Sequence, residues 1–360
     1  MPGWVAALLL ALAVCAGCAA AQDGQATASI ASASVTGSAS PSSDAGTFSN
    51  PVLADDFPDP FVLEVDGAYF AYATGSAGAN IQVARSEDLV RWQRLEDALP
   101  ELPDWSTGDT WAPEVARTSA GFVMYYTLRS LSSVRIDGGY SQCISYAVGP
   151  EAAGPFADPN SEPLVCQPDL GGSIDATFTR DEAEVPHLVW KSDGNCCGLK
   201  TRFFIQELQE DGLGLVGKPR DLGLQNDRPW EGGVIEAPTV LRMGGIHYLF
   251  YSANDYASAD YAVGYATSAA IDGPYRDSEE NPILASPPGP AVAGVAAGPG
   301  HQSIIEDKAG DLWMLYHAWD AENIGTILPG RSMWLDELVF EDGKPQVKGP
   351  DAGPQAAPAT

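Results

Sequence analysis

Three carboxylates, one histidine and one tryptophan recur at a nearly constant distance before the ends of five similar hydrophobic runs. The residues are Asp59, Trp111, Asp175, Glu236 and His301, and the distance is the same in four units and shorter by a single position in the first. Carboxylates that lie close together can act as a general acid and a general base, because burial and neighbouring charges move their pKa values apart. A tryptophan could add a flat stacking wall, and a histidine could orient a carboxylate or contact a hydrated ion.

The hydrophobic runs predict the elements that position these residues. Each run is short, rich in aromatic and β-branched residues and preceded by a turn signal, which is typical of a β-strand. The runs are 68–73, 121–126, 185–190, 246–251 and 311–316. Their fairly even spacing is longer than ordinary propeller repeats but fits a four-stranded blade with long loops, and no repeat has an extended stretch of helical periodicity. The sequence therefore predicts an all-β fold, a five-bladed β-propeller, whose innermost strands bring the five residues together at the mouth of the central channel.

The composition supports a large core and excludes one class of partner. Hydrophobic residues make up 45% of the 360 residues, while 38 Gly and 28 Pro argue against long helices. The net charge is −29, from 48 acidic and 19 basic residues. Because such a surface repels a phosphate backbone, we expect no nucleic-acid partner.

The two ends of the sequence differ from its centre. Residues 1–21 are uncharged and apolar and read as an export signal, in which Ala16-Gly17-Cys18 is similar to the end of a lipoprotein signal, with Cys18 as the lipidated residue. Plain secretion after cleavage and an uncleaved anchor are the alternatives. Residues 22–49 are mostly Ser, Ala, Thr and Gly and predict a flexible linker, and 349–360 predict a disordered tail. The folded domain is expected over 50–348, secreted or lipid-anchored at the cell surface.

Four cysteines remain within the predicted domain, namely Cys143, Cys166, Cys196 and Cys197. An even number is consistent with an oxidising compartment and allows three pairings if all are bridged. One of these joins the adjacent pair Cys196–Cys197, and the sequence does not choose among them.

Convergent carboxylates are what cleavage of a glycosidic bond requires. One carboxylic acid protonates the leaving oxygen, and a second carboxylate acts from the opposite face of the sugar. A third carboxylate near the acid is expected to raise its pKa by repulsion. If the two carboxylates act with inversion, they should stand about 6.5 to 9.5 Å apart, to leave room for a water molecule.

Several phrases of the sequence together resemble family 43 of the glycoside hydrolases: 50–60, 110–114, 173–176, 234–238, 298–303 and 330–333. The resemblance covers about residues 50–348 and implies an inverting enzyme with a five-bladed propeller. It implies Asp59 as general base, Asp175 as the residue that tunes the pKa and orients substrate, and Glu236 as general acid. It also implies that Arg331 contacts the sugar and that His301 lies on the channel axis, where some members hold a hydrated calcium ion. No cofactor is expected to be required.

The substrate implied by this resemblance is a plant-type polysaccharide. Many xylosidases of this kind carry a large C-terminal domain, whereas this sequence reaches Thr360 too soon after Arg331 to contain one. We therefore expect an α-L-arabinofuranosidase acting on arabinan or arabinoxylan, with β-xylosidase and endo-arabinanase as alternatives. Two further alternatives are a retaining, fructan-active five-bladed glycosidase and a non-catalytic carbohydrate-binding propeller.

Overall fold

A computed structural model describes residues 46–360. The predicted export signal, Cys18 and most of the predicted linker lie outside the described residues. Within the described part of the chain, no helix has the length and apolarity needed to cross a membrane.

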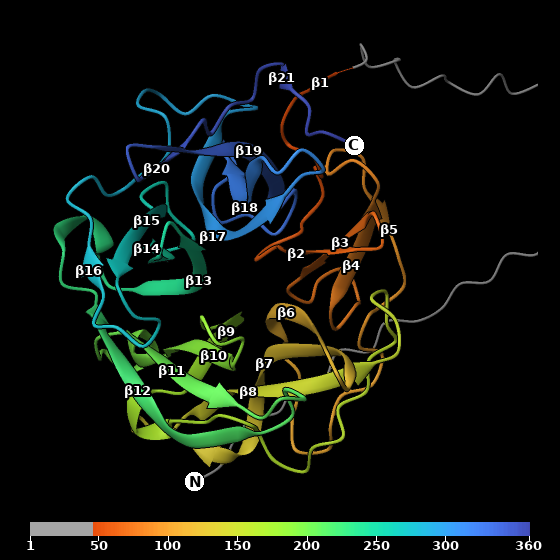
Figure 1. The fold of residues 1–360 in the computed structure, drawn as a ribbon, viewed down its shortest axis with the longest axis vertical. Helices are drawn as coiled ribbons and strands as arrows, with labels where there is room; N and C mark the ends of the chain where they lie inside the picture. Colours follow the sequence, from red (N-terminus) through yellow and green to blue (C-terminus); the bar gives the residue numbers. More distant parts are fainter. Residues whose placement is uncertain (1–45) are drawn as a thin grey trace, which may run out of the picture. The chain divides into compact units, whose positions relative to one another are not determined.

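The fold is a five-bladed β-propeller, as predicted (Figure 1). Each blade is an antiparallel sheet in which strands that are consecutive in sequence are neighbours, as expected for a propeller. The first two blades contain β2 (Phe61–Val65), β3 (Ala68–Ala73), β4 (Gln82–Ser86) and β5 (Gln93–Arg94), then β6 (Trp111–Thr118), β7 (Gly121–Val134) and β8 (Tyr140–Gly149). The third contains β9 (Ser173–Arg180), β10 (Pro186–Ser192), β11 (Arg202–Leu208) and β12 (Leu215–Gln225). The last two contain β13 (Ile235–Met243), β14 (Ile246–Ala253), β15 (Ala262–Ser268) and β16 (Arg276–Asp277), then β17 (Ala296–Glu306), β18 (Leu312–Asp320), β19 (Arg331–Glu341) and β20 (Lys344–Val347).

The five hydrophobic runs form the second strand of each blade, namely β3, β7, β10, β14 and β18. The runs themselves are mostly buried within these strands, and β14, for instance, has one exposed residue followed by seven buried ones. A strand covered on both faces needs a continuous apolar run rather than an alternating one. This burial explains why the second strands gave the clearest signal in the sequence.

The core consists of five hydrophobic clusters, and each fills the space between two neighbouring blades. Between the second and third blades, for example, Tyr125 and Trp190 are fully buried and pack with Leu188 and Val123. Such packing between sheets fixes the angle of each blade. The inner strands are thereby held around one axis.

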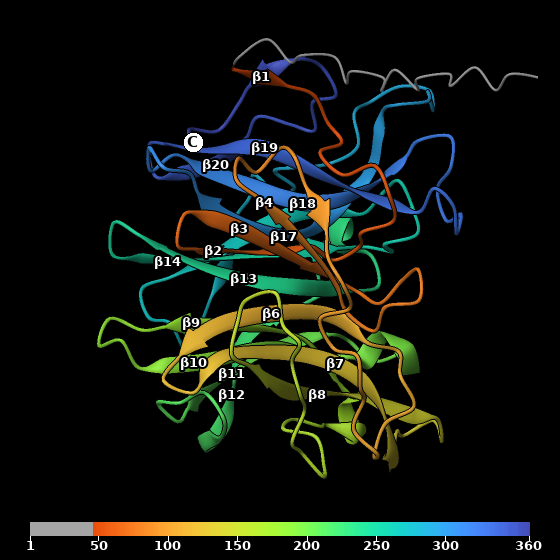
Figure 2. The same cartoon turned by 90° about the vertical axis from the view of Figure 1, so that its right-hand side faces the viewer.

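The ring is closed by chain segments on either side of the last blade. The backbone N–H of Phe57 donates to the carbonyl of Arg331 at 2.8 Å, which joins the segment before β2 to β19. In addition, β1 (Thr47–Phe48) pairs with β21 (Gln355–Ala356), and the two are labelled side by side in Figure 1, while Figure 2 shows β1 at the edge of the propeller. The prediction of a disordered tail over 349–360 is therefore wrong, and the folded part begins within the segment assigned to the linker. The tail gains order from backbone pairing with a strand at the opposite end of the described chain, which its own composition does not reveal.

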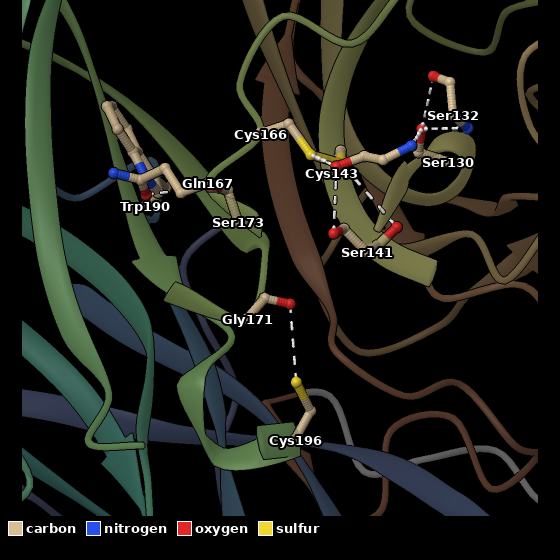
Figure 3. The surroundings of a disulfide bond; sticks show 11 residues. Ser130, Ser132, Ser141, Cys143, Cys166, Gln167, Gly171, Ser173, Trp190 and Cys196 are labelled. Atoms are coloured by element: carbon tan, nitrogen blue, oxygen red, sulfur yellow. Dashed lines mark hydrogen bonds between the residues drawn. A yellow bond between two sulfur atoms is a disulfide. The ribbon is translucent and has the colours of Figure 1, made fainter. Parts of the chain in front are cut away.

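One disulfide is present, between Cys143 in β8 and Cys166 (Figure 3). Cys196 and Cys197 carry free thiols on the short 3-10 helix η2 (Gly194–Cys197), and the Cys196 thiol points toward the carbonyl of Gly171. Two further 3-10 helices are η1 (Pro168–Leu170) and η3 (Pro229–Glu231). Of the pairings left open by the sequence, the structure contains only this one bridge among the described residues.

Candidate active site

Five non-glycine residues with left-handed backbone geometry surround the channel, four of them near the start of an inner strand and the fifth within β17. We call them the left-handed set; their φ angles are 57° at Asp59, 44° at Ala112, 55° at Asp175, 53° at Ala237 and 51° at His301. A positive φ is uncommon outside glycine and costs about 1 kcal/mol or more. Its repetition at an equivalent place in every blade indicates a built feature of the site.

The left-handed set corrects the predicted register in two blades. Asp59, Asp175 and His301 belong to the set, whereas Trp111 and Glu236 each precede a member, Ala112 or Ala237, by one residue. The sequence placed all five predicted residues at one equivalent position. The side chain of Glu236 therefore leaves the chain one residue earlier than those of Asp59 and Asp175.

A second repeated position anchors this set. It is the residue that follows each predicted strand run, and we call it the anchor position: Thr74, Thr127, Lys191, Ser252 and His317. In four cases the anchor side chain accepts the backbone N–H of a left-handed residue in the next blade. The pairs are Ala112 with Thr74 (2.9 Å), Asp175 with Thr127 (3.3 Å), His301 with Ser252 (2.7 Å) and Asp59 with His317 (3.1 Å).

Asp59 is the most strongly stabilised carboxylate of the site. Arg331 donates to its Oδ1 at 2.8 Å, Thr74 donates to its Oδ2 at 2.5 Å, and His301 Nδ1 lies 3.3 Å from Oδ1. Burial alone would raise the pKa of Asp59, but Arg331 and His301 hold it well below its ordinary value. Burial lowers the pKa of His317 to about 4, so its ring is neutral and Nδ1 can accept the Asp59 N–H. Asp59 is thus ionised over the whole physiological range.

Arg331 is held in place by aromatic rings and by the chain before β2. Its guanidinium lies 4.8 Å from the ring centre of Tyr256 and 5.9 Å from that of Trp319. Its backbone N–H donates to Asp56 at 2.9 Å. Stacking of this kind restricts the planar guanidinium and directs its donors toward Asp59 and the pocket.

Glu236 lies between a lysine and a tyrosine. Lys191 Nζ is 2.9 Å from its Oε2, and the hydroxyl of Tyr261 donates to its Oε1 at 2.7 Å. Burial would raise the pKa of Glu236, but Lys191, His301 and Tyr261 outweigh burial and lower it. The ionised form of Glu236 is therefore favoured in the free site.

Asp175 has the opposite tendency. Burial and the negative charge of Glu236 raise its pKa, although His301 and Lys191 partly offset them. Its Oδ2 accepts the backbone N–H of Ala237 at 3.0 Å. The sequence predicted that a third carboxylate would raise the pKa of the acid, Glu236, but in the free site the raised pKa belongs to Asp175.

These groups line one pocket of about 390 Å³. All six predicted site residues contribute to it, so the structure brings Asp59, Trp111, Asp175, Glu236, His301 and Arg331 together. The sequence analysis missed other lining residues, which include Thr74, Arg135, Tyr140, Lys191, Asp193 and Tyr256. Thr74 and Lys191 could have been found by counting one residue forward from each strand run instead of only backward.

The resemblance implies a hydrated calcium ion near His301, whose imidazole offers nitrogen atoms and no oxygen. Calcium takes six to eight oxygen ligands. Among residues 46–360, no group of three or more His, Cys, Asp or Glu side chains is placed to hold a metal ion. An ion held through water molecules stays a prediction, which metal analysis of the purified protein would check.

Comparisons with known proteins agree with this architecture. Residues 48–345 match the family described as "Glycosyl hydrolases family 43". A beta-xylosidase of Bacillus subtilis is 27% identical and covers 84% of this chain, which spans only 57% of that protein. An extracellular endo-alpha-(1->5)-L-arabinanase of the same organism is 24% identical, with 80% of this chain and 86% of that protein covered. A solved thermostable family-43 glycoside hydrolase superposes with a TM-score of 0.76 at 32% identity, over 87% of this chain and 99% of that one. With this match over most of its length, the chain belongs to family 43 of the glycosyl hydrolases.

Proposed function

We propose that this glycoside hydrolase releases terminal α-L-arabinofuranosyl units from arabinan or arabinoxylan, with inversion at the anomeric carbon. The observation that carries the proposal is the convergence of Asp59, Asp175 and Glu236 in one pocket, each in a different charge environment. Pairs of titratable groups whose pKa values are pushed apart are typical of acid–base catalysis.

In the proposed reaction Asp59 is the general base. It removes a proton from a water molecule, whose oxygen attacks the anomeric carbon while the glycosidic bond breaks on the opposite face. Glu236 gives its proton to the leaving oxygen. One water molecule is consumed, Asp59 gains one proton and Glu236 loses one. The ion pair with Arg331 supports the first role, because it keeps Asp59 ionised.

Asp175 is proposed to tune and orient the acid. Its hydrogen bond to the Ala237 N–H fixes the backbone directly after Glu236. The negative charge of Glu236 raises the pKa of Asp175, and Glu236 itself must take up a proton before it can act as the acid. Trp111 and Arg331 are proposed to bind the sugar through stacking and hydrogen bonding.

The size of the pocket supports release of an end unit. A volume of about 390 Å³ is near the lower end of the range for small-ligand pockets. The β-xylosidase and endo-arabinanase activities stay alternatives, since relatives with both printed names match this chain.

Product analysis of the purified protein tests the proposal. The protein is incubated with arabinan, arabinoxylan, xylan, galactan and fructan, and the products are separated by chromatography while NMR follows the first anomer formed. We expect free arabinose of inverted configuration. Xylose as the main product would favour the β-xylosidase, arabino-oligosaccharides would favour the endo-enzyme, and a retained configuration would contradict the roles given to Asp59 and Glu236.

The variant Glu236→Gln separates an enzyme from a carbohydrate-binding propeller. Loss of the general acid should lower kcat on unactivated substrates by about 10² to 10⁴-fold while sugar binding persists. If the wild-type protein binds these glycans but does not cleave them, the carbohydrate-binding alternative would be favoured.

We propose that the chain is exported and either secreted or anchored through a lipid on Cys18. Two observations support export: the Cys143–Cys166 bridge is of a kind that persists in oxidising compartments, and the arabinanase relative is named extracellular. Fractionation of cells that express the full chain, beside Cys18→Ala, decides between the two forms, since only a lipid-anchored protein would leave the membrane fraction in the variant.

A further inference from the structure

One of the five anchor positions breaks the pattern of the other four. Thr74, Thr127, Ser252 and His317 each accept a backbone N–H from the next blade. The third blade has Lys191 in this place, and an ammonium group has three donors and no acceptor. The N–H of the next left-handed residue therefore needs another partner.

The site provides that partner from Asp175. Its Oδ2 accepts the Ala237 N–H at 3.0 Å, in the role that an anchor side chain has in the other blades. Lys191 instead reaches the residue before Ala237, and its Nζ lies 2.9 Å from Glu236 Oε2. With an ammonium group at this anchor position, Asp175 is held by the Ala237 N–H and Glu236 is held by Lys191.

Lys191 is fully buried, at 0% exposure. A buried ammonium is costly unless it is paired. Burial would lower the pKa of Lys191, but Glu236, Asp175 and Asp193 outweigh it and raise that pKa. The charge of Lys191 therefore persists at every pH at which the protein is expected to work.

The charged and titratable groups that face Glu236 come from several elements. They are Asp175 of β9, Lys191 of β10, Asp193 after β10, Tyr261 before β15 and His301 of β17. Lys191 is the one group in this set with both a permanent positive charge and a direct contact with the carboxylate.

We propose that Lys191 is a positioning residue, which fixes the carboxylate of Glu236 in the pocket and sets the alkaline limit of catalysis. This inference rests on the proposed function, in which Glu236 must be protonated to act. Because a neighbouring positive charge favours the ionised carboxylate, Lys191 restricts the protonated form of Glu236 to lower pH.

Two variants of Lys191 test the inference. Lys191→Met keeps a long side chain without charge, and Lys191→Arg keeps the charge. The pH profile of kcat/KM is measured for both and for the wild type. We expect Lys191→Met to move the alkaline limb upward by about 1 to 3 pH units, and Lys191→Arg to leave it near the wild-type position. If Lys191→Met does not fold, Lys191→Ser takes its place, since Ser252 shows that this side chain suits the anchor position.

A second measurement does not depend on turnover. The ¹³C signals of the side-chain carboxylates are titrated by NMR, and Glu236→Gln identifies the signal of Glu236. We expect its midpoint to rise in Lys191→Met. A folded variant in which neither the alkaline limb nor this midpoint moves would overturn the inference. If the wild type shows no turnover but the midpoint of Glu236 still rises in Lys191→Met, the result would support the placement of Lys191 and contradict the proposed function instead.

Discussion

At the scale of single residues, each of two cationic side chains in the site pairs with a different carboxylate. Arg331 pairs with Asp59, and Lys191 pairs with Glu236. Each carboxylate that acts in the proposed reaction therefore has its own partner, while Asp175, which makes no direct ion pair in the structure, has the raised pKa. This separation keeps the proposed base ionised and moves the pKa values of Asp175 and Glu236 in opposite directions.

The pairing of Arg331 with Asp59 predicts the acidic limb of the pH profile. A base acts only when ionised, so activity falls as the pH drops through the pKa of Asp59, which is held well below its usual value. Arg331→Met removes the nearest positive charge, and we expect the acidic limb to move upward by about 1 to 3 pH units. Arg331→Lys is the matched control and should move it less. An acidic limb that does not shift in Arg331→Met would remove Asp59 from the role of base.

At the scale of elements, the second strands of the blades could be predicted because their burial requires long apolar runs. The inner strands could be located only by counting from these runs, and the count gave the wrong register in the second and fourth blades. The reason is the left-handed geometry at Ala112 and Ala237, which is set by hydrogen bonds from neighbouring blades. The role of Lys191 was missed for the same reason, since it appears only when the five anchors are compared with their partners.

The clasp formed by β1 and β21 was not predicted, and its contribution to stability can be measured. Phe48 pairs with Gln355, is 6% exposed, and packs edge-on against Trp313 at 6.1 Å between ring centres. We expect Phe48→Ala to lower the free energy of unfolding in urea by about 3 kcal/mol, through lost burial and a cavity. The control is Ile327→Ala at a side chain that is 90% exposed, which should change it by less than about 0.5 kcal/mol. Equal small effects of the two substitutions would mean that the clasp adds nothing to the closure of the ring.

At the scale of the whole molecule, the five blades leave a narrow channel behind the pocket. Its free volume is about 30 Å³, which is room for one water molecule. Each blade contributes three consecutive residues to its lining, and the first of the three is the member of the left-handed set. Glu114 of β6 faces this channel, where Thr177 donates to its Oε2 at 2.6 Å and the Phe178 N–H donates to its Oε1 at 2.7 Å. Burial nevertheless raises the pKa of Glu114 to about 8.

This raised pKa predicts that the propeller loses stability as the solution becomes alkaline. The unfolded chain releases the Glu114 proton near its ordinary pKa of 4.5, whereas the folded protein retains it up to about pH 8. Because the folded state binds more protons between these values, its stability falls as the pH rises from about 4.5 to 8 and then levels off.

The variant Glu114→Gln tests this pH dependence, because it imitates the protonated side chain: its carbonyl can accept from Phe178 and its amide can donate to Thr177. We therefore expect calorimetry to give similar Tm values for the two proteins at pH 5 and a higher Tm for Glu114→Gln at pH 8.5. The carboxyl of Asp336, whose pKa burial raises to about 6, is present in both proteins and cancels in the comparison. Tm curves that stay parallel from pH 5 to 8.5 would place the charge of Glu114 in contact with solvent, and the channel would then be open to water along its length.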